Sequence, residues 1–231
     1  MTAMATLREL GEFEVLRRLT AARGPGSVGD AAAGVVVDSG DDAAVLRPGT
    51  GMDLVATTDA FVSGVHFLPE WCPPGRAGAR LAQANLSDLA AMAAAPRWAL
   101  LSVGARPDSA VEDLVAFQSG LAAALRTAGA TLVGGNLTAV EHADWYSLAL
   151  LGECGRGRAW RRAGARPGDL VAVSGRPGRA GAGLRLARAL GGAVRAAEWA
   201  PLLQAWLEPE ARVGLALALR EAGAVTAAID V

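Results

Sequence analysis

Oxygen-bearing side chains gather at three places in the first ninety residues, each beside an apolar run. Carboxylates that meet at the end of a sheet repel one another unless a cation lies between them. Because hard oxygen ligands combined with substrate phosphates suit Mg²⁺, this arrangement predicts a magnesium-dependent site for phosphorylated ligands. Taken singly, each residue could instead have an ordinary turn or helix-capping role. The residues are Asp41, Asp42, Thr57, Thr58, Asp59 and Asp88.

Three further features could contact a phosphorylated ligand. The segment Gly134-Gly135-Asn136 follows an apolar run and could bring backbone N–H groups close to an anion. His66 follows the T-T-D segment by seven residues. The one basic cluster offers forked guanidinium groups, which suit phosphate oxygens. A plain turn, a structural histidine and a solvated loop are the respective alternatives. The clustered arginines are Arg156, Arg158, Arg161, Arg162 and Arg166.

The composition limits the classes of protein to which the chain can belong. Of its 231 residues, 52% are hydrophobic, which indicates a folded core rather than disorder. The net charge of −1 creates no general attraction for nucleic acid or an anionic membrane. No apolar run reaches the roughly 18 residues of a membrane span, and the N-terminus lacks the apolar core of a signal peptide. We therefore expect a cytoplasmic protein with reduced thiols at Cys72 and Cys154.

All 22 basic residues are arginines. The absence of lysine excludes a P-loop, the catalytic lysine of protein kinases and a Schiff-base mechanism. If the chain binds ATP, it must do so by another route.

Alternating helices and strands must position these groups. Helical spacing and end signals predict helices over 7–22, 75–94, 110–128, 181–190 and from Pro209 to near Gly223. Apolar runs with flanking Gly and Pro predict strands. These strands are 34–37, 43–46, 53–58, 98–104, 130–133, 145–152, 167–175 and the last eight residues.

Local signals refine the element ends. Ser109 and Glu112 have the spacing of a capping box, which predicts a helix start at about 110. Gly129 is expected to end that helix in the left-handed conformation, and Pro96 to stop the preceding one. The apolar run over 130–133 is expected to end in the glycine pair.

Several strands follow one another without an intervening helix, which favours a mixed α+β sheet or barrel over a doubly wound parallel sheet. A change in composition near 155–165 suggests a domain boundary. We therefore expect an N-terminal domain over 1–155 and part of a second, α/β domain over 156–231.

Several motifs together closely resemble the thiamine-monophosphate kinase family, within the superfamily of aminoimidazole ribonucleotide synthetase. The resemblance extends over nearly the whole chain, and the T-T-D and N-L-S-D blocks are its most specific parts. The motifs are G-E-F-E-V-L (11–16), G-D-D-A-A-V-L (40–46), T-T-D-A-F-V-S-G-V-H-F (57–67), N-L-S-D-L-A-A-M (85–92), V-G-G-N (133–136), R-R-A-G-A-R-P-G-D (161–169) and A-I-D-V (228–231).

The resemblance implies ATP-dependent phosphorylation of thiamine phosphate to thiamine diphosphate, with several Mg²⁺ ions at each site. It implies that His66 contacts thiamine phosphate, and that Gly135, Asn136 and Arg162 contact ATP. It implies no covalent catalytic residue. The metal ligands it implies are Asp42, Thr57, Thr58, Asp59, Asp88, Asn136 and Asp230.

The resemblance also implies a homodimer in which the N-terminal sheets form one shared barrel. The chain departs from the family where Gly178-Arg179-Ala180 replaces a Gly-Asp-Ser segment. It also stops at Val231, inside the family's I-D-x-S-D-G segment, so we expect a C-terminally truncated form or a fragment.

Two other functions remain open from the residues. One is another ATP-using enzyme of the superfamily, such as an aminoimidazole ribonucleotide synthetase-type cyclo-ligase. The other is a non-catalytic dimer module that binds nucleotide.

Overall fold

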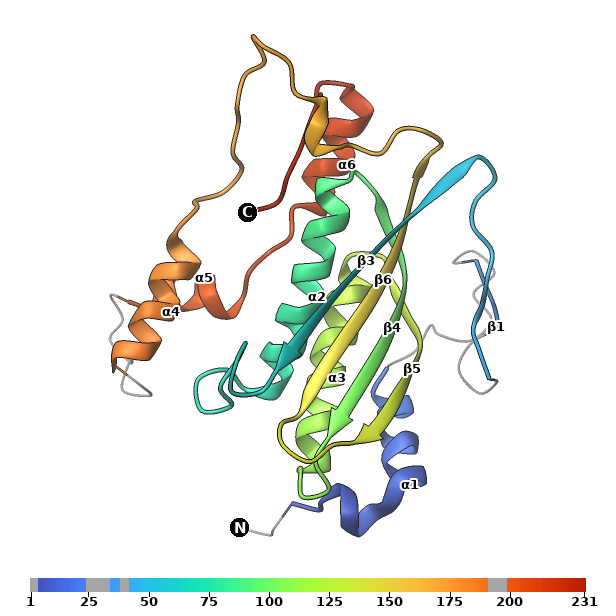
Figure 1. Ribbon diagram of the computed structural model, residues 1–231, viewed down its shortest axis with the longest axis vertical. Helices are drawn as coiled ribbons and strands as arrows, with labels where there is room; N and C mark the ends of the chain where they lie inside the picture. The colour runs from blue at the N-terminus through green and yellow to red at the C-terminus, as the bar shows by residue number, and fades with distance from the viewer. Residues whose placement is uncertain (1–3, 24–33, 38–41, 191–198) are drawn as a thin grey trace.

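A four-stranded mixed sheet forms the centre of the protein, seen in a computed structural model that describes residues 4–23, 34–37, 42–190 and 199–231. Its strand order is β3-β6-β4-β5. β6 runs antiparallel to β3 and β4, and β4 runs parallel to β5, so the predicted mixed α+β sheet is confirmed (Figure 1). The strands are β3 Met52–Val62, β4 Ala95–Ala105, β5 Thr131–Ala139 and β6 Trp145–Gly155.

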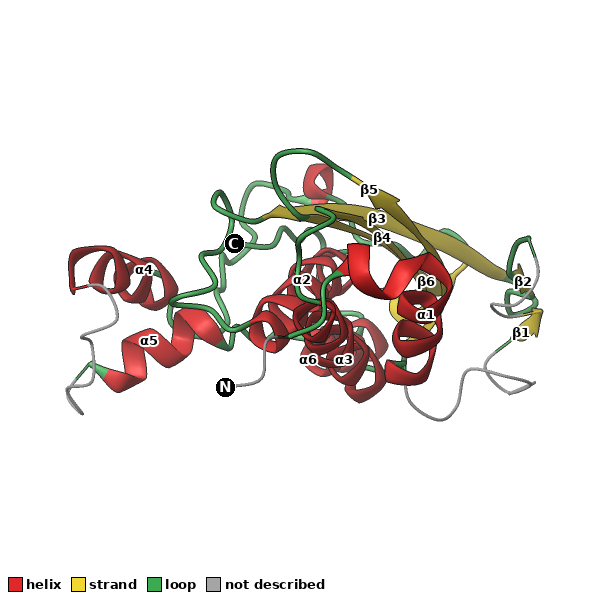
Figure 2. Ribbon diagram, turned by 90° about the horizontal axis from the view of Figure 1, so that it is seen from below, coloured by secondary structure: helices red, strands yellow, loops and turns green. Residues whose placement is uncertain are grey.

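Two helices, α2 Pro74–Ala91 and α3 Val111–Thr127, cover one face of this sheet. Figure 2 shows α2, α3 and α6 on this side of the sheet, and no described α-helix covers the opposite face. The two helices pack closely because residue 78 is glycine: a Cβ there would lie 1.9 Å from the Phe117 carbonyl oxygen. The main core lies between these helices and the inward side chains of the sheet.

The helix α1, Leu7–Ala22, has a capping box formed by Thr6 and Glu9 and a break in helical geometry at Gly11. It packs on α3, where the Gln118 amide donates a hydrogen bond to the Leu19 carbonyl. The predicted length of this helix is confirmed.

The capping box predicted at Ser109 and Glu112 is wrong. The N-cap of α3 is Ala110, which makes no side-chain capping bond. The Ser109 hydroxyl instead donates to the Asp144 carboxylate, with oxygen–oxygen distances of 2.7 and 2.8 Å. Ser109 lies one residue before the N-cap, so its hydroxyl is not at the position from which a side chain caps the first turn.

The remaining elements lie around this central layer. β1 Val35–Val37 and β2 Val45–Leu46 form a separate two-stranded sheet, and Val35 packs against Trp98 and Val133. The C-terminal third contains η2 Arg162–Gly164, α4 Arg179–Leu190, α5 Ala200–Leu207 and α6 Val213–Ala222.

Several predicted ends differ from the structure. Pro96 does not stop a helix: α2 ends at Ala91, and Pro96 lies in β4 beside a register shift, where proline is tolerated. β5 does not end at the glycine pair but continues through it to Ala139. Helix α6 begins at Val213 rather than at Pro209, although Gly223 is its left-handed C-cap as expected. Gly129, with φ 85°, also ends α3 as predicted.

The strands predicted over 167–175 and in the last residues are absent from the described structure. Leu170 and Val171 are almost fully exposed. A strand is stabilised by a hydrogen-bonded neighbour, and no described strand lies beside either segment.

Both cysteines are buried free thiols, as expected. Among the described residues, no helix has the length and apolar character needed to cross a membrane.

Candidate phosphate and metal site

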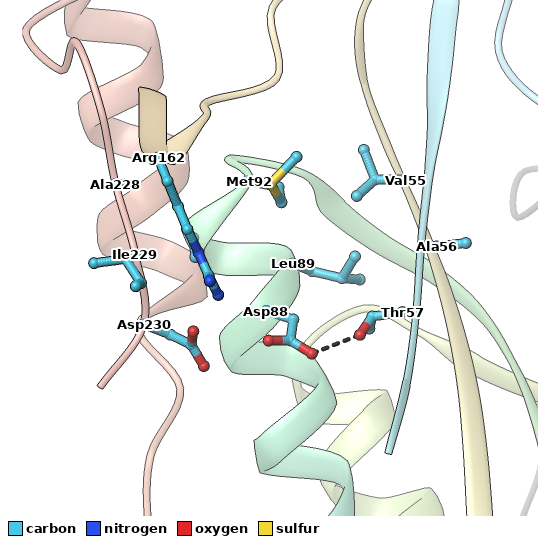
Figure 3. A pocket seen from close by; sticks show the side chains of 11 residues that line it. Val55, Ala56, Thr57, Asp88, Leu89, Met92, Arg162, Ala228, Ile229 and Asp230 are labelled. Atoms are coloured by element: carbon cyan, nitrogen blue, oxygen red, sulfur yellow. Dashed lines mark hydrogen bonds between the residues drawn. The ribbon is translucent and has the colours of Figure 1, made fainter. Parts of the chain in front are cut away.

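A pocket of about 260 Å³ lies between β3, the C-terminal half of α2, η2 and the segment 228–230 (Figure 3). Thr57, Asp88, Arg162 and Asp230 supply its polar side chains. All four were predicted site residues, and they come from four separate parts of the chain. The other lining residues are Val55, Ala56, Leu89, Ala91, Met92, Ala228 and Ile229.

The Thr57 hydroxyl donates a hydrogen bond to the Asp88 carboxylate, at an oxygen–oxygen distance of 2.5 Å. This bond joins the edge strand β3 to α2. Side chains alternate along a strand, so Thr57 and Asp59 share the face toward α2, whereas Thr58 lies on the exposed opposite face. The structure thus separates Thr58 from the two residues beside it.

Asp59 lies next to the pocket and has a raised pKa. The main cause is burial, followed by the negative charges of Asp88 and Asp230, while His66 opposes the shift. The charges of two other carboxylates therefore act on Asp59 at this edge of the sheet. A bound cation would relieve that repulsion.

The oxygen donors of the site fit Mg²⁺ held together with phosphates. Within the described ranges, no group of three or more His, Cys, Asp or Glu side chains is close enough to bind a metal ion without other ligands. Mg²⁺ is commonly held by one or two carboxylates plus substrate phosphates and water. Asp88, Asp59 and the Thr57 hydroxyl could supply oxygen ligands of this kind.

A clip between two C-terminal segments positions Arg162 and Asp230. The Thr226 hydroxyl donates to the Asp169 carboxylate at 2.6 Å, and the Arg166 N–H donates to it at 2.9 Å. These bonds hold the residues before Asp230 against the residues after Arg162. In Figure 3 the guanidinium of Arg162 points toward the carboxylates of Asp88 and Asp230.

His66 lies beyond Asp59, where β3 ends. Its ring stacks on Phe61 with 5.6 Å between centroids and 10° between planes. Its Nδ1 atom accepts a hydrogen bond of 3.1 Å from the Val62 N–H. The imidazole is exposed, so its Nε2 side is open to a ligand.

Gly135 and Asn136 do not reach this pocket within one chain. They lie on β5, the opposite edge of the sheet, about 14 Å from β3 at the usual strand spacing. Asn136 aligns across the sheet with Ser102, Ser147 and Ala60, and that row faces away from the helices.

Gly135 has a structural reason to be glycine. A Cβ at this position would lie 1.9 Å from the Leu101 carbonyl oxygen of the neighbouring strand. Glycine at this position therefore permits close packing of β5 against β4, and this reason is independent of any contact with ATP.

Asp42 is exposed just before β2 and does not line the pocket. Its neighbour Asp41 lies outside the described residues.

Arg80, which no motif had singled out, lies over the Phe61 ring near the end of β3 that precedes His66. Helical spacing could have found it, because Arg80 precedes Asp88 by eight residues and so shares a stripe of α2 with it.

Comparison with known proteins shows what the N-terminal part of the chain is similar to. Residues 40–154 match the family described as AIR synthase related protein, N-terminal domain. This match contains the sheet, α2, α3, and the Thr57 and Asp88 side of the pocket.

More specific similarity distinguishes one family within that class. Thiamine-monophosphate kinase from Corynebacterium glutamicum is 33% identical over 221 residues, covering 95% of this chain and 63% of that protein. The crystal structure of thiamine-monophosphate kinase from Stenotrophomonas maltophilia superposes with a TM-score of 0.76 at 34% identity, covering 91% and 65% of the two chains. Over most of its length the chain is therefore similar to thiamine-monophosphate kinases.

A further solved structure is described as AaThiL complexed with AMPPCP and TMP. It is 30% identical, has a TM-score of 0.69, and aligns with 96% of this chain and 66% of its own. The present chain thus spans somewhat less than two thirds of the length of these relatives.

Proposed function

We propose that this chain contributes the ATP- and Mg²⁺-binding site of a kinase that converts thiamine phosphate to thiamine diphosphate. The pocket that brings Thr57, Asp88, Arg162 and Asp230 together is the observation that carries the proposal. The related structure with AMPPCP, an ATP analogue, and TMP supports the choice of both substrates.

The proposed reaction needs no general base, because the attacking atom is an oxygen of a phosphate that is already anionic. The difficulty is to bring two anions together in line, so catalysis depends on positioning and charge neutralisation. Arg162 would bind ATP phosphate oxygens from one side of the pocket. The Thr57–Asp88 hydrogen bond would fix the orientation of the carboxylate opposite.

We propose Asp59, Asp88, Asp230 and Thr57 as the magnesium ligands supplied by this pocket. Bound Mg²⁺ would neutralise phosphate charge during transfer. Asp42, Thr58 and Asn136 remain predicted ligands that would have to approach from outside the pocket.

A homodimer with a shared barrel would explain the bare sheet face and the two unpaired edges, β3 and β5. If the β5 edge of one copy pairs with the β3 edge of the other, Gly135 and Asn136 come to lie beside the acidic strand. The residues up to 155 would form this nucleotide-binding and dimerisation domain. Residues 156–231 would form part of a second domain, in a cytoplasmic enzyme without nucleic-acid or membrane partners.

A coupled assay of ADP release tests the function. With Mg-ATP and thiamine phosphate, we expect turnover by a preparation of this chain and at least a 100-fold loss in Asp88→Asn, since a metal-binding charge and the Thr57 contact are both altered. Asp108→Asn is the matched control, because Asp108 is exposed far from the pocket.

Release of ADP with an aminoimidazole precursor but not with thiamine phosphate would favour the cyclo-ligase. Calorimetric binding of Mg-ATP without any turnover would favour the non-catalytic module.

A further inference from the structure

Two rows of side chains face each other along β3 and α2. On β3, Thr57, Asp59 and Phe61 share the face toward the helix. On α2, Arg80 and Asp88 share a stripe and lie about 12 Å apart along the axis. Thr57 bonds Asp88 at one end of these rows, and Arg80 lies over Phe61 at the other.

Arg80 occupies an unusual setting for an arginine. Its guanidinium carbon lies 5.5 Å from the centroid of the Phe61 ring and 5.1 Å from that of Trp206. Its Nη1 atom is 3.9 Å from the Cys72 sulfur, a weak contact. Within the described ranges it forms no ion pair, and its buried Nε atom has no hydrogen-bond partner.

Arg76, one turn earlier on the same helix, provides the contrast. It is about half exposed and forms a 2.7 Å ion pair with Glu208. The two arginines of this helix therefore differ in their surroundings. A carboxylate already pairs with Arg76, whereas among the described residues no carboxylate pairs with Arg80, and aromatic rings and a sulfur atom lie beside it.

We propose that Arg80 binds the anionic phosphomonoester of the acceptor substrate and thereby selects a phosphorylated acceptor over the corresponding alcohol. This inference deepens the proposed function and rests on it. Aromatic rings hold the guanidinium in place, so less side-chain freedom is lost when its unused N–H groups meet an anion. His66, the predicted acceptor-binding residue, stacks on the same Phe61 ring.

The position of Arg80 also suits the chemistry of the reaction. A phosphomonoester is a dianion near neutral pH, and its approach to the carboxylates of Asp59 and Asp88 is unfavourable. Arg80 lies at the end of the two rows that is farther from Asp88, and its positive charge offsets that repulsion for the acceptor. Arg162 provides the cation at the pocket end.

Calorimetric titrations with thiamine phosphate, thiamine and inorganic phosphate, all in the presence of Mg²⁺ and AMPPCP, test this assignment. In Arg80→Met, which keeps the length of the stem, we expect affinity for thiamine phosphate to fall about 10- to 100-fold, the range for a charge-assisted hydrogen bond. Affinity for thiamine should stay within twofold. Arg76→Met is the matched control and should leave both affinities unchanged.

The outcomes separate the role of Arg80 from the proposed function. If Arg80→Met weakens thiamine and thiamine phosphate equally, or neither, then Arg80 only packs α2 against α5 and the assignment is overturned while the kinase proposal stands. If the chain binds inorganic phosphate in an Arg80-dependent manner but neither thiamine compound, the anion site stands and the proposed acceptor falls. Arg80→Lys, which keeps the charge without the fork, should show an intermediate loss and serves if Arg80→Met does not fold.

Discussion

Two hydroxyl–carboxylate hydrogen bonds determine the position of the acidic groups, one inside the pocket and one outside it. Inside, Thr57 donates to Asp88. Outside, Thr226 donates to Asp169 and holds the segment that carries Asp230. The second bond does not touch the pocket, yet it sets the distance between Asp230 and Arg162 and should influence the affinity for Mg-ATP.

The Asp169 carboxyl should titrate below its ordinary value. The Thr226 hydroxyl first, and the Arg166 N–H second, lower the pKa of Asp169 from 3.8. A carboxyl with a lower pKa in the folded state stabilises that state above the unfolded pKa, and this contribution is lost as the pH falls below about 3.8. NMR titration should show the Asp169 midpoint rising toward 3.8 in Thr226→Val. Equal midpoints in the wild type and the variant would show that the clip is absent in solution.

At the scale of single residues, the sequence predicted the polar side chains of the pocket but not the full set of residues that line it. Thr57, Asp88 and Arg162 were predicted from their residue types beside apolar runs or in the basic cluster, whereas Asp230 was expected only from the resemblance to the family. Asp144 was assigned no role. Its hydrogen bond with Ser109 joins residues 35 positions apart, and the spacing of neighbouring residues cannot reveal a contact of that range.

Helix packing sets the position of Asp88, because α2 can shift only as far as its contact with α3 allows. Gly78→Ala would place a methyl group against the Phe117 carbonyl. We expect a loss of about 1–3 kcal/mol in the free energy of unfolding, the usual effect of overpacking. Urea denaturation measures it.

Gly181→Ala in α4 is the matched control. No atom lies within 4 Å of a Cβ at that position. The change should therefore stabilise the protein by up to about 1 kcal/mol, from the difference in helix propensity. A similar effect of both substitutions would contradict the close contact of α2 with α3.

The helices could be predicted more reliably than the strands. Periodicity and end signals located α1, α2, α3 and α4, since a helix satisfies its own backbone hydrogen bonds. The segment 167–175 has the composition of a strand but no described neighbouring strand. The composition of a segment cannot predict whether a partner strand will lie beside it. The helix α5 was missed.

In the described part of the chain, one face of the sheet has no helical cover and the edge strands β3 and β5 each have one neighbour, and a single chain explains neither feature. Ala149 lies in the middle of that face, aligned with Thr58 and Leu100. If two copies close a barrel, Ala149→Arg should bury a charge without a partner and dissociate the dimer. Sedimentation velocity should then show a monomer, and ATP-site affinity should fall.

Ala123→Arg, on the exposed side of α3, is the control and should leave the dimer intact. A dimer that persists unchanged in Ala149→Arg would rule out the shared barrel.

The order in which the pocket residues occur along the chain has a consequence for biosynthesis. Thr57 and Asp88 emerge from the ribosome early, but β3 cannot pair until β6 has been made, and the pocket is completed only when Asp230 follows. At roughly 5–20 residues per second, the early part of the chain exists for several seconds without the strand that joins β3 to β4. Nucleotide cannot stabilise it during that interval. Until then, packing of α2 against α3 can stabilise the early part of the chain.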